Sequence, residues 1–303
     1  MTDRRPIGVF DSGVGGLTVL REIVRRTPSE STIYLGDNAR APYGTRPDDE
    51  VRRFSVESID ALVERDVKAV VVACNTSTAV AIGDLRRRYD LPILGVIRPG
   101  AVAASLTTRN RRVGVIATPA TIRSRAYFGA IKDENPAIEV YEHATPAFVP
   151  MVEAGELAGP DAEATVRRSL APLLGDRDDA GDFVFPLPVS ARIDTLLLGC
   201  THYPLLRPVL EVVVGEGIAI VDSAQATASA LSELLGINGL EAPATATGTH
   251  QQLTTGDVGR FREIATRMFG ESFPDVSGVD LGTGRAGTAR GRSVAATSAG
   301  SVR

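Results

Sequence analysis

The stretch Ala69-Val70-Val71-Val72-Ala73-Cys74-Asn75-Thr76-Ser77-Thr78 decides the fold, because it joins a short apolar run to polar residues that favour the start of a helix. An uninterrupted apolar run of this length predicts a strand buried on both faces, as in a parallel sheet. A similar stretch, Leu196-Leu197-Leu198-Gly199-Cys200-Thr201-His202-Tyr203-Pro204, lies in the second half of the chain. The chain therefore contains an approximate internal repeat, with one cysteine at the carboxyl end of each strand.

Short β-rich runs alternate with longer helical patterns, which predicts an α/β fold with mostly parallel sheets flanked by helices. The predicted strands are residues 7–10, 32–36, 69–73, 93–96, 112–117, 138–141, 195–199 and 219–222, and the predicted helices are 17–26, 48–65, 78–89, 121–131 and 225–235. Open α/β sheets place their ligands at the carboxyl ends of strands. We therefore expect two pseudo-symmetric domains that face each other across one cleft containing both cysteines.

Composition and charge limit the classes of function. The 303 residues are 43% hydrophobic and 23% charged, with a formal net charge of -4, as in ordinary globular enzymes. This balance gives no positive field for nucleic acid or an anionic membrane, and no apolar run reaches the roughly 18 residues of a membrane helix. Asp11 interrupts the apolar segment that a signal peptide would need, so we expect a cytoplasmic protein.

Three further features concern the organisation of the chain. Pro99-Gly100 predicts a hinge or domain boundary. The segment 175–192 is rich in Gly, Asp and Pro and predicts a surface loop insertion. From residue 284 onward the chain has almost no large apolar residues, so we expect a disordered tail over 284–303.

The cysteines are the strongest candidates for chemistry. In a reducing compartment two distant cysteines are expected as thiols rather than as a structural disulfide. A helix N-terminus after Cys74 would lower the pKa of the thiol and attract a carboxylate, and both effects help a cysteine act as a base. His202, two residues after Cys200, is a candidate partner for proton movement. An inert, buried cysteine and a structural histidine are the alternatives.

The segment Asp11-Ser12-Gly13-Val14-Gly15-Gly16 follows the first predicted strand. It is not a dinucleotide-binding loop, because Thr18 stands where the third glycine is needed and Asp11 would repel a pyrophosphate. We expect Asp11 to meet a substrate ammonium group or to influence a thiol, with Ser12 adding a hydrogen bond. A turn-stabilising aspartate is the alternative.

Metal and pyridoxal chemistry find no support in the sequence. The three histidines and two cysteines form no metal-binding motif. The two lysines are Lys68, which precedes a buried strand, and Lys132, which lies in a polar segment, so neither suits a Schiff base. We expect neither a metal nor a cofactor.

Taken together, these motifs resemble the glutamate racemases of the aspartate/glutamate racemase superfamily. The resemblance covers about residues 6–283 and rests on the segments 8–17, 35–37, 42–44, 73–76 and 198–205. It implies a first domain formed by 1–98 with 223–283, a second formed by 99–222, and a homodimer. It also implies substrate-binding roles for Asp11, Ser12, Tyr43, Gly44, Asn75, Thr76, Thr118, Thr121, Thr201 and His202, and a catalytic role for Glu153 beside Asp11 and His202.

The mechanism implied by the resemblance uses two bases on opposite faces of the α carbon of glutamate. Cys74 would deprotonate D-glutamate and Cys200 L-glutamate, and the D-glutamate formed would serve peptidoglycan synthesis. A racemase or decarboxylase acting on aspartate or another acid is an alternative, as is modulation of DNA gyrase, which some family members perform. Dithiol redox chemistry is disfavoured, because no C-x-x-C motif is present.

Overall fold

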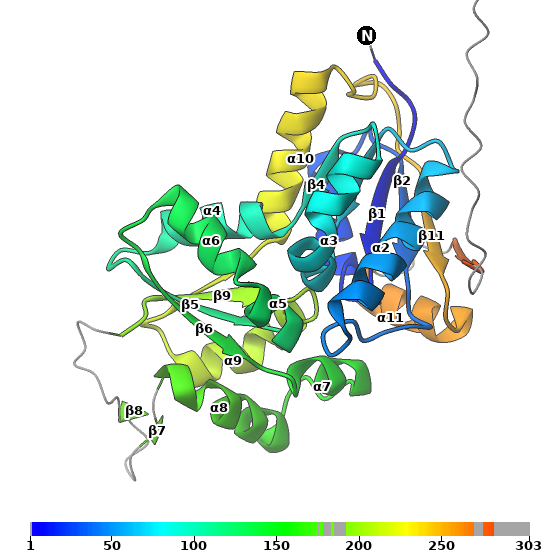
Figure 1. The fold of residues 1–303 in the computed structure, drawn as a ribbon. Helices are drawn as coiled ribbons and strands as arrows, with labels where there is room; N and C mark the ends of the chain where they lie inside the picture. The colour runs from blue at the N-terminus through cyan, green and yellow to red at the C-terminus, as the bar shows by residue number, and fades with distance from the viewer. Residues whose placement is uncertain (1, 175, 178–182, 185–191, 270–274, 282–303) are drawn as a thin grey trace, which may run out of the picture.

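Most strands of the computed structural model form two parallel sheets (Figure 1). The structure describes residues 2–174, 176–177, 183–184, 192–269 and 275–281. The larger sheet has the order β12-β11-β2-β1-β3-β4 and the smaller β10-β9-β5-β6. The larger consists of β1 (Ile7–Asp11), β2 (Thr32–Gly36), β3 (Ala69–Val72), β4 (Ile93–Gly95), β11 (His250–Thr254) and β12 (Val276–Gly278); the smaller consists of β5 (Arg112–Ala117), β6 (Glu139–Ala144), β9 (Thr195–Gly199) and β10 (Ala219–Asp222). The predicted α/β class with two mostly parallel sheets is confirmed.

Helices cover both faces of the larger sheet, which explains the continuous apolar runs of its strands. Val9 and Val71 point to one face and pack with α1 (Leu17–Arg26), α10 (Ala224–Asn238) and α11 (Val258–Phe269). Phe10 and Val70 point to the other face and pack with α2 (Asp48–Val63) and α3 (Asn75–Arg88). All four of these strand side chains are fully buried.

The smaller sheet is covered in the same way. Val113 and Val115 of β5 pack with α4 (Ile97–Thr107) and α6 (Ala126–Glu134) on one face. Ile116 faces the opposite layer, which consists of α7 (Phe148–Ala154), α8 (Pro160–Leu174) and α9 (Arg207–Val214). Two short elements sit at the carboxyl edge of this sheet: α5 (Pro119–Ser124) after β5, and the 3-10 helix η2 (Tyr203–Leu206) after β9.

The larger sheet is assembled from both ends of the chain. β11 pairs with β2 along its whole length, from His250 opposite Thr32 to Thr254 opposite Gly36, and Figure 1 shows this late strand beside the blue N-terminal strands. The division into a domain of 1–98 with 223–283 and a domain of 99–222 stays a prediction. Among the described residues, no helix combines the length and the apolar character that a membrane span requires.

Several local predictions need correction. Pro99 and Gly100 do not form a hinge loop but lie buried in the first turn of α4, where a proline is tolerated because the first N–H groups of a helix have no partner within it. The predicted helix 121–131 is divided into α5 and α6 by Arg125, which adopts a φ of 57°. Within the segment 175–192, β7 (Asp176–Arg177) and β8 (Phe183–Val184) pair antiparallel; most of the remainder, and the predicted tail 284–303, lie outside the described residues.

Candidate active site

A cavity opens at the carboxyl edges of both sheets, and both cysteines line it. Cys74 follows β3 and Cys200 follows β9, so the repeated strand-then-cysteine pattern brings two thiols to one place. Both are buried and neither is in a disulfide. The larger-sheet side of the wall consists of Ser12, Ala41, Pro42, Tyr43, Gly44, Thr45, Cys74, Asn75 and Thr76, and the smaller-sheet side consists of Thr118, Pro119, Thr145, Pro146, Val149, Pro150, Glu153, Cys200, Thr201 and His202.

Cys74 caps the N-terminus of α3. Its Sγ accepts a hydrogen bond from the backbone N–H of Ser77 at 3.4 Å and donates to Oγ of Ser12 at 3.4 Å. Burial, and after it the negative charge of Asp11, raise the pKa of this thiol to about 11, although the hydrogen bonds with Ser12 and Ser77 act to lower it. The backbone N–H of Ser77 at the helix N-terminus lowers this pKa, as predicted, but the net shift is upward because loss of solvent outweighs the helix.

Cys200 belongs to a chain of three titratable side chains. Its Sγ lies 3.8 Å from Nδ1 of His202, and Nε2 of His202 lies 3.5 Å from Oε1 of Glu153. Burial lowers the pKa of His202, but its contacts with Cys200 and Glu153 prevail and raise it to about 10. This shift favours the protonated imidazole at neutral pH. No α-helix begins at Cys200, since η2 precedes α9, so the positive charge beside this thiol comes from His202.

Asp11 lies behind the cavity wall and does not line it. Its side chain is fully buried and accepts hydrogen bonds from the backbone N–H of Gly13 at 3.0 Å and from Oγ1 of Thr201 at 3.3 Å. Burial raises the pKa of Asp11. Asp11 therefore stabilises the turn through Gly13, and its charge raises the pKa of Cys74. Thr201, which donates to Asp11, is the residue of this pair that lines the cavity.

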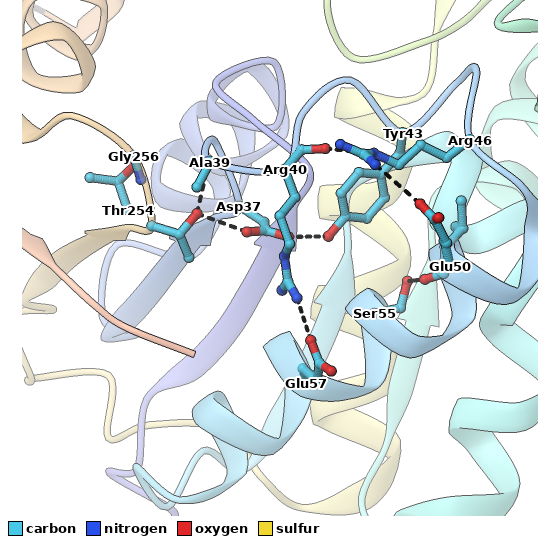
Figure 2. Close-up of polar contacts among 12 residues, drawn as sticks. Asp37, Ala39, Arg40, Tyr43, Arg46, Glu50, Ser55, Glu57, Thr254 and Gly256 are labelled. Carbon is cyan, nitrogen blue, oxygen red and sulfur yellow. Dashed lines mark hydrogen bonds and ion pairs between the residues drawn. The ribbon is translucent and has the colours of Figure 1, made fainter. Parts of the chain in front are cut away.

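The loop that carries Tyr43 and Gly44 is held by the buried carboxylate of Asp37, which the sequence analysis did not single out. The hydroxyl of Tyr43 and, at 2.7 Å, Nε of Arg40 both donate to the carboxylate of Asp37 (Figure 2). Arg40 also pairs with Glu57. Thr255, which follows β11, donates to the same carboxylate at 2.7 Å. Because its hydroxyl is directed to Asp37, Tyr43 offers the cavity its ring and its backbone.

Gly44 brings this loop against the opposite wall. A Cβ atom at Gly44 would lie 2.6 Å from Cβ of Thr118, and the carbonyl of Gly44 accepts a hydrogen bond from the backbone N–H of Ala120 at 3.1 Å. Only glycine allows the two backbones to approach so closely.

Three threonines connect the walls on the same side. Oγ1 of Thr76 lies 2.9 Å from Oγ1 of Thr118, which lies 3.0 Å from Oγ1 of Thr121. Thr76 and Thr118 line the cavity, whereas Thr121 supports them from behind. Ser124 donates to the backbone of Thr121 and takes no part in the wall.

The sequence analysis missed eight wall residues: Ala41, Pro42, Thr45, Pro119, Thr145, Pro146, Val149 and Pro150. Thr145 and Pro146 directly follow β6, which ends three residues later than predicted. Had the end of this strand been predicted correctly, the position of both residues at its carboxyl end would have made them candidates for the wall. In the described part of the chain, no group of three or more His, Cys, Asp or Glu side chains gathers as metal ligands.

Comparison with known proteins gives consistent matches. Residues 7–180 match the family model described as Asp/Glu/Hydantoin racemase. A glutamate racemase of Shouchella clausii is 44% identical over 91% of this chain and 95% of its own length, and one of Oceanobacillus iheyensis is 45% identical over 88% and 93%.

Solved structures agree. Glutamate racemase RacE1 of Bacillus anthracis superposes with a TM-score of 0.82 at 40% identity, over 92% of this chain and 98% of that one. The Francisella tularensis glutamate racemase, solved in complex with D-glutamate, has a TM-score of 0.79 at 31% identity over the same shares.

Proposed function

The chain belongs to the Asp/Glu/hydantoin racemase family, and we propose that it interconverts L- and D-glutamate without a cofactor, by proton transfer to and from Cys74 and Cys200. The observation that carries this proposal is the presence of two free thiols, one from each sheet, in the wall of one cavity. Glutamate is supported as the substrate by relatives at 44% and 45% identity and by a relative solved with D-glutamate. The product D-glutamate would supply peptidoglycan synthesis.

Inversion of a stereocentre requires removal of a proton from one face of the α carbon and delivery of another to the opposite face. The α proton is weakly acidic, so the reaction needs close positioning and exclusion of water. One thiolate takes the proton while the opposing thiol donates, and the roles exchange in the reverse direction. We assign Cys74 as the base for D-glutamate and Cys200 as the base for L-glutamate.

The surroundings of the two thiols suit different starting roles. Cys74, with its pKa of about 11, is a neutral thiol at physiological pH and is ready to donate. Cys200 lies beside a protonated His202, which stabilises the negative charge that forms on the sulfur when it removes a proton. Glu153 holds His202 in this state, and its own pKa is lowered by that histidine. Asp11 keeps proton loss from Cys74 unfavourable until a substrate ammonium group brings a positive charge nearby.

The remaining wall residues would bind the substrate. Hydroxyl groups of Ser12, Thr76, Thr118 and Thr201 and the amide of Asn75 offer hydrogen bonds to carboxylate oxygens, and the loop of Tyr43 and Gly44 offers backbone N–H groups. Thr121 and Asp11 act through Thr118 and Thr201, which they hold.

Incubation with each enantiomer of glutamate in deuterated water tests the proposal, with optical rotation and deuterium at the α carbon followed together. We expect rotation to decay to zero from both sides and product to carry deuterium. Cys74→Ala and Cys200→Ala should each abolish net racemisation; near-native turnover by either variant rejects the two-thiol assignment. Aspartate as a parallel substrate should give far slower turnover.

The homodimer and the contact with DNA gyrase stay predictions. Sedimentation equilibrium tests the first and a supercoiling assay tests the second.

A further inference from the structure

Asn75 carries a buried hydrogen-bond donor without a partner. The residue lines the cavity, is only 2% exposed, and its Nδ2 finds no acceptor among the described residues. An unsatisfied buried polar group is costly, so such a group in a cavity wall points to a ligand atom that completes it. A donor in this place complements an acceptor such as a carboxylate oxygen.

The opposite side of the same amide is held by Tyr127. Oδ1 of Asn75 accepts a hydrogen bond of 2.6 Å from the hydroxyl of Tyr127, which is fully buried on α6. Because the hydroxyl of Tyr127 is the donor in this bond, it fixes Oδ1 of Asn75 toward Tyr127 and leaves Nδ2 for the cavity. Ser223 lies beside the same hydroxyl and acts to lower its pKa.

Tyr127 also packs beneath the loop of the second thiol. A Cβ atom at Gly199 would lie 2.9 Å from Cε2 of Tyr127, so the residue before Cys200 rests against this ring. The ring belongs to the smaller-sheet half of the molecule, whereas Asn75 follows Cys74 in the larger-sheet half. One side chain therefore contacts both cysteine-bearing segments. Burial raises the pKa of the Tyr127 hydroxyl, which keeps its proton available over the physiological range.

We propose that Tyr127 is a positioning residue, whose hydroxyl fixes the Asn75 amide so that Nδ2 donates to a carboxylate oxygen of the substrate. The inference rests on the proposed function for the identity of that substrate. If the amide were free to turn, its carbonyl oxygen would face the carboxylate for part of the time and repel it. Because this contact exists in the ground state and the transition state alike, its loss should raise KM and leave kcat nearly unchanged.

The test is a double-mutant cycle between Tyr127→Phe and Asn75→Ala. We expect Tyr127→Phe to raise KM for both enantiomers about tenfold, with kcat changed less than about threefold. In the Asn75→Ala background the same change should have less than about a twofold effect, since the amide it orients is gone. Tyr89→Phe is a matched control: this hydroxyl is partly buried and also donates within the fold, to Asp60 and to the carbonyl of Val56, but lies outside the cavity wall. It should change KM by less than about twofold.

Binding of glutamate and of glutarate, measured by calorimetry on the same variants, separates this inference from the proposed function. Racemisation by the wild type without coupling between Tyr127 and Asn75 overturns the inference alone. Coupled binding of the dicarboxylates without racemisation overturns the proposed function alone, and failure of the wild type to bind either compound overturns both. If Tyr127→Phe does not fold, Ser223→Ala replaces it in the cycle, with the same coupling expected at a smaller size.

Discussion

The charge of Asp11 should control the ionisation of Cys74, and Asp11→Asn isolates this effect because it removes the charge with little change in shape. Burial is the larger cause of the raised Cys74 pKa and stays in place in the variant, whereas the second cause is removed. The pKa of Cys74 should therefore fall from about 11 toward the ordinary value of 9.0.

The size of the effect follows from these two values. At pH 8 a thiol with a pKa of about 11 is ionised to about one part in a thousand, and a thiol with a pKa of 9.0 to about one part in ten. Alkylation by iodoacetamide proceeds through the thiolate, so the rate at Cys74 should rise severalfold, with about 100-fold as the upper limit.

Mass spectrometry of the Cys74 peptide after timed alkylation measures this rate. Asp194→Asn is the control, because Asp194 also accepts several hydrogen bonds but lies at the opposite end of β9 from Cys200; it should leave the Cys74 rate within about twofold. An unchanged or slower rate in Asp11→Asn, with the control unchanged, refutes the electrostatic account.

Three further predictions concern the walls of the cavity. His202 has a raised pKa, so its contribution to the free energy of unfolding is complete below about pH 6.5 and is lost as the pH rises toward 10. Glu153→Gln should lower that pKa. The difference in unfolding free energy between wild type and variant, measured by urea titration, should therefore shrink over this pH window. Asp37→Asn removes one of the two carboxylates of the partly buried Arg40, which keeps Glu57, so we expect a loss of about 1–3 kcal/mol in urea unfolding and a raised KM. A native KM would show that this carboxylate does not hold the loop of Tyr43 and Gly44 in its binding position. Gly15→Ala places a Cβ 2.5 Å from Oγ1 of Thr201 in the opposite wall and should lower the free energy of unfolding by about 1–3 kcal/mol. Gly129→Ala, whose Cβ would meet nothing within 4 Å on a helix, should raise it by about 0.5–1 kcal/mol. Thermal denaturation measures both changes.

The fold could be predicted where strands are buried on both faces. The runs at 69–73 and 195–199 are continuous and apolar, and they form β3 and β9 within one residue of the predicted bounds. β11 was missed because its sequence, His250-Gln251-Gln252-Leu253-Thr254, has polar residues in most positions. Gln252 is nevertheless fully buried, so tertiary pairing overrides the local pattern. α4 was missed because Pro and Gly usually interrupt a helix, and the sequence alone does not show that Pro99 and Gly100 lie in its first turn, where they are tolerated.

The sequence could predict the place of the cavity and part of its wall, but not its electrostatics. The residues that follow β1, β3, β5 and β9 meet in one place because carboxyl ends of parallel strands share an edge. The direction of the Cys74 pKa shift could not be predicted, because it depends on burial and on a carboxylate 63 positions away in the chain. Asp37 was overlooked for the same reason: its partners Arg40 and Tyr43 are local, but its third partner, Thr255, comes from the other end of the sequence.

The pairing of β2 with β11 has a consequence for synthesis on the ribosome. Thr32 and its partner His250 are separated by 218 positions, which at about 5–20 residues per second take roughly 10–40 s to translate. During that interval β2 is an exposed edge that offers unpaired backbone groups to other nascent chains. Completion of the larger sheet is therefore a late event, because β2 gains its second neighbour only when the last part of the polypeptide emerges.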